Sequence, residues 1–122
     1  MNKISLCGLF PYLIYSIYYN SHGMFLIYIN GVLFHSFPKS KIFYTIDFVT
    51  NTFFFIYSSI NYPFVFKYMI FTFISFLINI HFFKEYKLLC EFNHVIFVQW
   101  VGLYAILNVY KINDCFPLLY YC

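Results

Sequence analysis

The sequence predicts an all-α protein, a multi-pass bundle of about five transmembrane helices. Of its 122 residues, 63% are hydrophobic, 28% are aromatic and only 9% are charged, whereas about a quarter of an ordinary soluble domain is charged. The few charged residues leave apolar stretches close to the roughly 20 residues with which a helix crosses about 30 Å of hydrocarbon. Turn-forming or polar residues separate these stretches, so we expect the chain to cross the membrane several times.

The composition also excludes several other classes of protein. A soluble domain of this size would have to cover its surface with eleven charged residues, which would leave large apolar patches in water. Disordered chains are poor in the aromatic residues that abound here. Nucleic-acid binding is not expected, because a net charge of +3 from seven Lys and no Arg is too small to follow a phosphate backbone.

The abundant residue types point to the kind of genome that encodes the chain. Phe, Ile, Tyr, Asn and Lys together make up 65 of the 122 residues, and Arg is absent. These residues use A/T-rich codons, so the bias indicates an AT-rich genome, such as that of a large DNA virus, a protist or an organelle. Part of the Tyr and Asn content then reflects mutation pressure.

The first 38 residues predict two helices, at 4–20 and 21–37, with a hinge at Asn20-Ser21-His22-Gly23. Ser21 is a good N-cap residue for the second helix. A single long helix is the alternative, and it would reduce the total from five spans to four. With five spans, five of the seven lysines fall on one side, namely Lys3, Lys39, Lys41, Lys84 and Lys87. The positive-inside rule makes that side, and the N-terminus, cytoplasmic.

The remaining spans follow from the charge-free stretches. They are predicted at 43–60, 64–83 and 93–110. Asn61-Tyr62-Pro63 is a turn sequence between the first two, and residues 84–87 are polar and separate the second from the third. Residues 1–112 therefore form one transmembrane bundle, in contact with membrane lipids, and residues 113–122 form a short tail. Assembly into a homo- or hetero-oligomer is left open.

The four cysteines, Cys7, Cys90, Cys115 and Cys122, have no CxxC spacing, which excludes a zinc ribbon. Cys115 and Cys122 lie on the non-cytoplasmic side of the predicted topology. A disulfide between them and two free thiols are both compatible with the sequence.

Ionisable side chains inside a membrane are costly, so each is a functional candidate. The topology places His35, Asp47, His81 and His94 near the cytoplasmic boundary. Three imidazoles and an open position are typical of catalytic zinc, so His35, His94 and His81 are predicted metal ligands. Asp47 is the predicted catalytic base. The alternative is that these groups gather at the interface because water is near.

Smaller polar and small residues predict helix packing. Asn30 and Gln99 are expected to form interhelical hydrogen bonds, and Gly31 and Gly102 to let helices approach closely. No predicted helix carries the repeated polar face that would line a channel.

The segment from Asn30 to His35, followed twelve residues later by Asp47, resembles a motif of the alkaline ceramidases and the related progestin/adipoQ-type receptors. The resemblance implies a zinc-dependent membrane amide hydrolase. In it, His35 would be the first zinc ligand, Asp47 the motif's Asp and His94 the first His of a last-helix pair. The chain departs from the family where Gly31 replaces a Ser, where Val98 replaces the second His, and in having five spans in place of seven. The enzyme would then be inactive, or His81 would supply the third ligand.

Two functions therefore remain. The first is a small membrane protein with a structural role. The alternative is the ceramidase-like hydrolase, with zinc as its cofactor.

Overall fold

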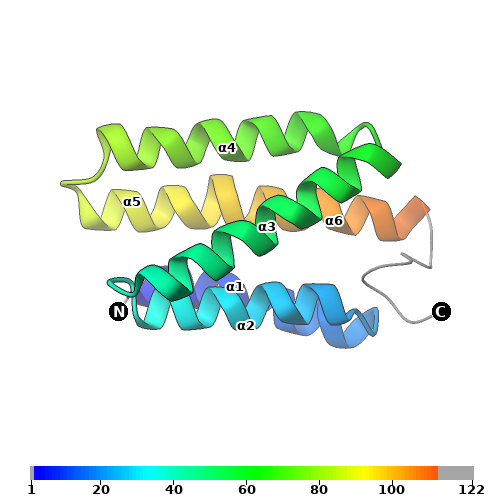
Figure 1. The fold of residues 1–122 in the computed structure, drawn as a ribbon, viewed down its shortest axis with the longest axis horizontal. Helices are drawn as coiled ribbons and strands as arrows, with labels where there is room; N and C mark the ends of the chain where they lie inside the picture. The colour runs from blue at the N-terminus through cyan, green and yellow to red at the C-terminus, as the bar shows by residue number, and fades with distance from the viewer. Residues whose placement is uncertain (1, 113–122) are drawn as a thin grey trace.

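The computed structural model describes residues 2–112, apart from the side chains of residues 111 and 112, and throughout this range the ordered elements are helices (Figure 1). Four helices are followed by a fifth that passes through a π-helical segment, η1. Their bounds are α1 (Lys3–Tyr18), α2 (His22–Ser36), α3 (Lys41–Asn61), α4 (Val65–Phe82), and then α5 (Lys87–Asn93), η1 (His94–Trp100) and α6 (Val101–Ile112). The all-α prediction is confirmed. The predicted tail at 113–122 and its cysteines lie outside the described residues.

The turn between α1 and α2 settles the count at five helices. Asn20 has a φ of 51°, a left-handed conformation that Asn tolerates better than most residues. The next residue, Ser21, caps α2, because its Oγ accepts a hydrogen bond from the Met24 backbone N–H at 3.2 Å. The same Oγ lies 2.7 Å from the Tyr110 hydroxyl on α6. The first two spans are therefore separate helices, as the turn sequence predicts.

The fifth helix begins at Lys87, six residues before its predicted start. Residues 87–93 contain neither Gly nor Pro and are rich in good helix formers such as Leu, Glu and Lys. The helix therefore extends past the apolar stretch into the polar segment. The other four helices begin and end within two residues of the predicted positions.

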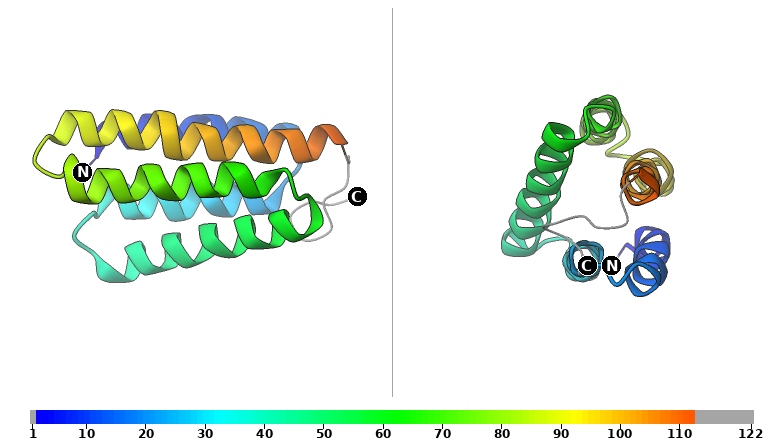
Figure 2. Two further views of the ribbon diagram at one scale, coloured as in Figure 1. Left: turned by 90° about the horizontal axis from the view of Figure 1, so that it is seen from above. Right: turned by 90° about the vertical axis from the view of Figure 1, so that its right-hand side faces the viewer.

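The five helices form a closed ring in which each runs antiparallel to the one before (Figures 1 and 2). Contacts join α1 to α2, α2 to α3, α3 to α4, and α4 to the fifth helix, which returns to α1 through η1 and α5. The end-on view of Figure 2 shows this order around the ring. In Figure 1, α3 crosses diagonally, close to α2 where it begins and close to α4 where it ends.

Small and polar residues bring the neighbouring helices together, as the sequence predicts. The side chain of Asn30 donates a hydrogen bond to the Thr50 hydroxyl across α2 and α3, at 3.2 Å. A Cβ on Gly31 would lie 2.7 Å from a methyl of Leu9, and one on Gly102 would lie 2.9 Å from the Phe55 ring. Gly31 therefore stands where α2 touches α1, and Gly102 stands where the fifth helix faces the Phe55 ring of α3; a larger residue at either position would require these side chains to shift.

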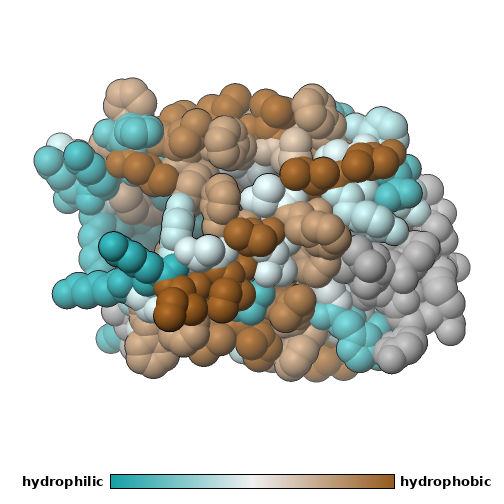
Figure 3. All heavy atoms as spheres, in the orientation of Figure 1, coloured by the Kyte–Doolittle hydropathy of each residue, from teal (hydrophilic) through white to brown (hydrophobic). Residues whose placement is uncertain are grey.

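Polar residues gather at the ends of the bundle and apolar residues cover its middle (Figure 3). The alternating helices place five lysines at the end where α1, α3 and α5 begin; we call this the Lys end, and its lysines are Lys3, Lys39, Lys41, Lys84 and Lys87. Lys67 and Lys111 belong to the opposite end. Two helices are long and apolar enough to cross a membrane by length and composition, Val65–Phe82 and Lys87–Tyr110.

The Ser21 hydroxyl contacts both the Met24 backbone N–H and the Tyr110 hydroxyl, and this predicts a large contribution of the hydroxyl to stability. Ser21→Ala removes the cap of α2 and the contact with Tyr110, so we expect it to lower the free energy of unfolding by about 2 kcal/mol. Ser40 caps α3 by accepting only from the Phe43 N–H, at 3.3 Å. Ser40→Ala should therefore cost about 1 kcal/mol. Denaturant unfolding in detergent micelles measures both, and equal losses would contradict the prediction.

Candidate functional site

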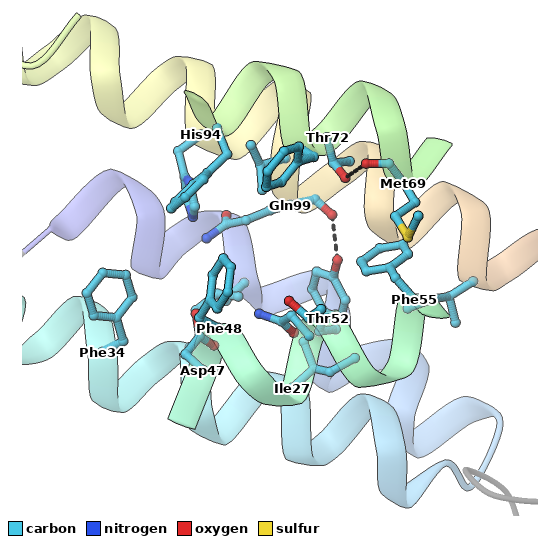
Figure 4. Close-up of a pocket in the computed structure, with 18 of the residues that line it drawn as sticks. Ile27, Phe34, Asp47, Phe48, Thr52, Phe55, Met69, Thr72, His94 and Gln99 are labelled. Atoms are coloured by element: carbon cyan, nitrogen blue, oxygen red, sulfur yellow. Dashed lines mark hydrogen bonds between the residues drawn. The ribbon is translucent and has the colours of Figure 1, made fainter. Parts of the chain in front are cut away.

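A cavity of about 310 Å³ lies inside the helix ring, and all five helices contribute residues to its wall. We call it the inner cavity. Its wall is mostly apolar and aromatic, with a few polar side chains among them (Figure 4). A largely apolar cavity with a small number of polar groups is typical of a site that binds a small molecule.

Three of the four predicted site residues, His35, Asp47 and His94, line the inner cavity. They come from α2, α3 and the fifth helix, so the fold brings together side chains that are up to 59 residues apart in the sequence. The fourth, His81, is exposed near the end of α4 and is not part of this wall. The structure thus brings two of the three predicted metal ligands together with the predicted base.

The imidazole rings of His35 and His94 are in direct contact, with ring centroids 4.9 Å apart and planes at 66°. His35 is only 4% exposed, and both of its ring nitrogens face a side-chain amide. Its Nε2 lies 3.4 Å from the Gln99 Nε2, and its Nδ1 lies 3.4 Å from the Asn2 Nδ2. The imidazole is held between these amides, and a metal bound through either nitrogen would displace one of them.

Gln99 connects His35 to α1. Its Nε2 also donates a hydrogen bond to the Ser5 carbonyl oxygen at 3.2 Å. This contact needs a glycine opposite, because a Cβ on Gly8 would collide with the Gln99 Oε1 and with the side chain of Val95. The Trp100 indole N–H donates to the Gly8 carbonyl at 3.1 Å. The short distance between α1 and η1 therefore places Gln99 against His35.

The π-helical segment sets the direction of His94 relative to Gln99. In an α-helix of 3.6 residues per turn, side chains five residues apart lie about 140° apart around the axis. A π-helix bonds residue i to residue i+5, which stacks such a pair on nearly one face. Because η1 spans His94–Trp100, both His94 and Gln99 can face the inner cavity. The family resemblance pairs His94 with Val98, one α-helical turn away, whereas the structure places Gln99 beside His94 in the cavity wall; the predicted interhelical hydrogen bond of Gln99 is confirmed.

Asp47 enters the inner cavity from the opposite wall. In Figure 4 its side chain lies on α3 across from His94, with Phe48 beside it. Asn51 is one helical turn further along α3, also lines the inner cavity, and is placed to hydrogen-bond the Asp47 carboxyl. The carboxyl is therefore in the same cavity as the two imidazoles, and Asn51 orients it from its own helix.

The predicted zinc site can be tested against this arrangement. Catalytic zinc uses three protein ligands, and His35 and His94 supply two adjacent imidazoles. Within residues 2–112, no group of three or more His, Cys, Asp or Glu side chains is close enough to hold a metal ion. The residues present in this range therefore do not fit a three-ligand zinc centre.

A second cavity, of about 480 Å³, opens at the Lys end, and we call it the vestibule. It shares the side chains of Phe34, His35, Phe76 and His94 with the inner cavity, so the two imidazoles stand between the two spaces. Apart from Ile80 and Cys90, its remaining lining residues are polar or charged, and they come from α1 and the residue before it, α4, the following turn and α5. These include Asn2, Ser5, Asn79, Lys84, Lys87 and Glu91.

Two acceptor oxygens in the vestibule wall are buried without a hydrogen-bond partner, namely Oε1 of Glu91 and Oδ1 of Asn79. Glu91 is only 7% exposed. The orientation of the Asn79 amide is set by its Nδ2, which donates to the Cys90 carbonyl at 2.9 Å. Sequence reasoning placed Glu91 outside the spans and missed it. The available signal was its position three residues before His94, on the same helix face.

Comparison with known protein families, with curated proteins and with solved structures finds no match to this chain. The resemblance to the alkaline ceramidases therefore gains no support from these comparisons and rests on the residues quoted for it.

The contacts of Gln99 predict a marked effect of its removal. Gln99→Leu would leave the Nε2 of His35 buried without this partner and would remove the bond from Gln99 to the Ser5 carbonyl, so the free energy of unfolding should fall by about 1–3 kcal/mol. Asn108→Leu is the matched control, because the Asn108 amide bonds only to the Tyr104 carbonyl of its own helix. It should change stability by less than about 0.5 kcal/mol. A similar loss for both variants, measured by denaturant unfolding in micelles, would refute this role for Gln99.

Proposed function

We propose that this chain is a small multi-pass integral membrane protein, encoded by an AT-rich genome, with a structural role. The observation that carries the proposal is the exposed apolar surface. Large hydrophobic side chains that are more than a third exposed occur on every helix, among them Ile17, Phe25, Ile60, Phe73 and Phe97. A surface of this kind in water would aggregate, whereas lipid tails cover it without cost.

The distribution of charge supports an orientation. Five lysines at the Lys end and two at the opposite end follow the positive-inside pattern, with the Lys end and the N-terminus in the cytoplasm. The lengths of α1 and α2, 16 and 15 residues, correspond to about 24 and 23 Å at 1.5 Å per residue. These helices are shorter than a typical hydrocarbon core, and local thinning of the bilayer around them accommodates the difference.

A ceramidase-like amide hydrolase is the second proposal. The contact between His35 and His94, with Asp47 in the same cavity, favours it. The absence of a third ligand within residues 2–112 counts against it. In this proposal His35 and His94 would hold a zinc ion, which would supply Lewis-acid chemistry, and Asp47 would have the role of general base.

If the protein is inserted in the membrane, alkaline extraction and one-sided cysteine labelling should each give a defined result. The protein should stay in the membrane pellet at alkaline pH and enter the soluble fraction only with detergent. Asn61→Cys, at the exposed end of α3, and Glu85→Cys, in the exposed turn at the opposite end of the bundle, should be labelled from opposite sides in a chain whose other cysteines are replaced. Release at alkaline pH, or labelling of both positions from one side, would contradict the proposal.

Metal analysis separates the two functions. The hydrolase requires about one zinc ion per purified chain, and His35→Ala and His94→Ala should each remove it. His81→Ala should remove it as well if His81 is the third ligand. If the purified protein contains no zinc, or if zinc stays bound in both His35→Ala and His94→Ala, the hydrolase proposal is wrong. The structural role is then the proposal that stands.

A further inference from the structure

We infer that the vestibule and the inner cavity together bind one membrane lipid with a phosphoethanolamine headgroup. The ammonium would contact Glu91 and Asn79, the phosphate would contact Lys84 and Lys87, and one hydrocarbon chain would enter the inner cavity. This inference rests on the proposed insertion in the membrane, because the Lys end must lie at the depth of lipid headgroups.

The two unpartnered oxygens indicate the chemistry of one half of the headgroup, which must donate hydrogen bonds. Glu91 Oε1 and Asn79 Oδ1 are both acceptors, and neither has a hydrogen-bond partner although both are buried in the wall of one cavity. A buried acceptor without a donor is costly, and most of all when it belongs to a carboxylate. A primary ammonium has three N–H donors and a positive charge. A primary ammonium therefore has the donors and the charge to match both oxygens, and we assign it to Glu91 and Asn79.

The lysines define the other half. Lys84 and Lys87 are exposed at the mouth of the vestibule, and neither forms an ion pair within the part of the chain that the structure describes. Lys87 precedes Glu91 by four residues, a spacing that allows pairing on one helix face, yet the two side chains do not pair here. Both ammonium groups therefore remain available for a phosphate, which lysine binds as a point charge.

The inner cavity provides the place for a hydrocarbon chain. It adjoins the vestibule at His35, His94, Phe34 and Phe76, and most of its wall is apolar. Its volume of about 310 Å³ is at the lower end of the range for small-molecule sites. We therefore assign it one hydrocarbon chain, and the second chain would stay in the bilayer.

The aromatic contact between α3 and α4 provides a route for that chain. The rings of Phe48 and Phe76 lie 6.1 Å apart between the two helices, at the end where α3 diverges from α4 (Figure 1). Phe48, in the cavity wall, is exposed on the outer surface, so rotation of these side chains would widen the inner cavity sideways toward the lipid. A chain can enter there while its headgroup stays at the Lys end.

The test compares lipids that differ in one headgroup feature. Protein in detergent micelles is titrated with phosphatidylethanolamine, phosphatidylcholine or phosphatidylglycerol, and binding is measured as thermal stabilisation. Phosphatidylcholine keeps the positive charge and lacks N–H donors, and phosphatidylglycerol lacks the charge. We expect the binding of phosphatidylethanolamine to reach half-saturation at a lipid concentration at least about tenfold lower than that needed for either of the other two lipids. One charge-assisted hydrogen bond is enough to give a factor of this size. Equal binding of the three lipids would overturn the inference.

Variants test which residues bind the ammonium and which bind the phosphate. Glu91→Gln should remove most of the preference for ethanolamine over choline, whereas Glu85→Gln, the same change in the exposed turn outside the vestibule wall, should leave the preference intact. The double variant Lys84→Gln/Lys87→Gln should weaken the binding of all three lipids by a similar factor. Circular dichroism checks that each variant keeps its helices. An unchanged preference in a folded Glu91→Gln variant would overturn the assignment of the ammonium.

A final comparison separates the contribution of the headgroup to binding from that of the hydrocarbon chain. Thr52→Phe adds a ring to the wall of the inner cavity (Figure 4), so it should weaken binding of the lipid and leave that of soluble glycerophosphoethanolamine unchanged. If the soluble headgroup stabilises the protein as well as the lipid does, the role of the inner cavity is wrong. Alkaline extraction of the same preparation tests membrane insertion separately, so the proposed function and this inference fail in different experiments.

Discussion

The hydrogen bonds of the Gln99 side chain hold three helices together, and the rest of the bundle depends on them. One amide group contacts the Ser5 carbonyl on α1 and the His35 ring on α2 while it belongs to the fifth helix. It closes the ring, since it joins the last helix to the first. Gly8 makes the approach possible, and a buried polar group that lost these bonds would find no water as a substitute.

Closure of the ring also divides the interior into two parts. His35 and His94 stand at the boundary, with the charged vestibule on the side of the Lys end and the mostly apolar inner cavity on the other. The division matches the chemistry of an amphipathic molecule, which has a polar head and an apolar chain.

The features that were predicted correctly depend on local sequence. The all-helical class follows from the apolar stretches, and the separation of α1 from α2 follows from Asn20 and Ser21, which form the turn and the cap. The interhelical bond of Asn30 and the close approach at Gly31 follow from side-chain size and polarity. The start of the fifth helix differs from the prediction, because the charged residues up to Glu91 marked the predicted boundary although Lys, Leu and Glu are good helix formers.

The sequence by itself determined the helical class, the number of helices and the segregation of lysine, because these depend on composition and on residues that are neighbours in the chain. It also identified His35, Asp47 and His94 as unusual for their surroundings. Only the tertiary structure decided that these three share a cavity while His81 lies outside it, that Gln99 meets His35, and that Glu91 and Asn79 face one vestibule. The reason is physical: such contacts depend on how helices pack and on the π-helical turn of η1, which rotates one face of the last helix. No local pattern in the sequence encodes that rotation.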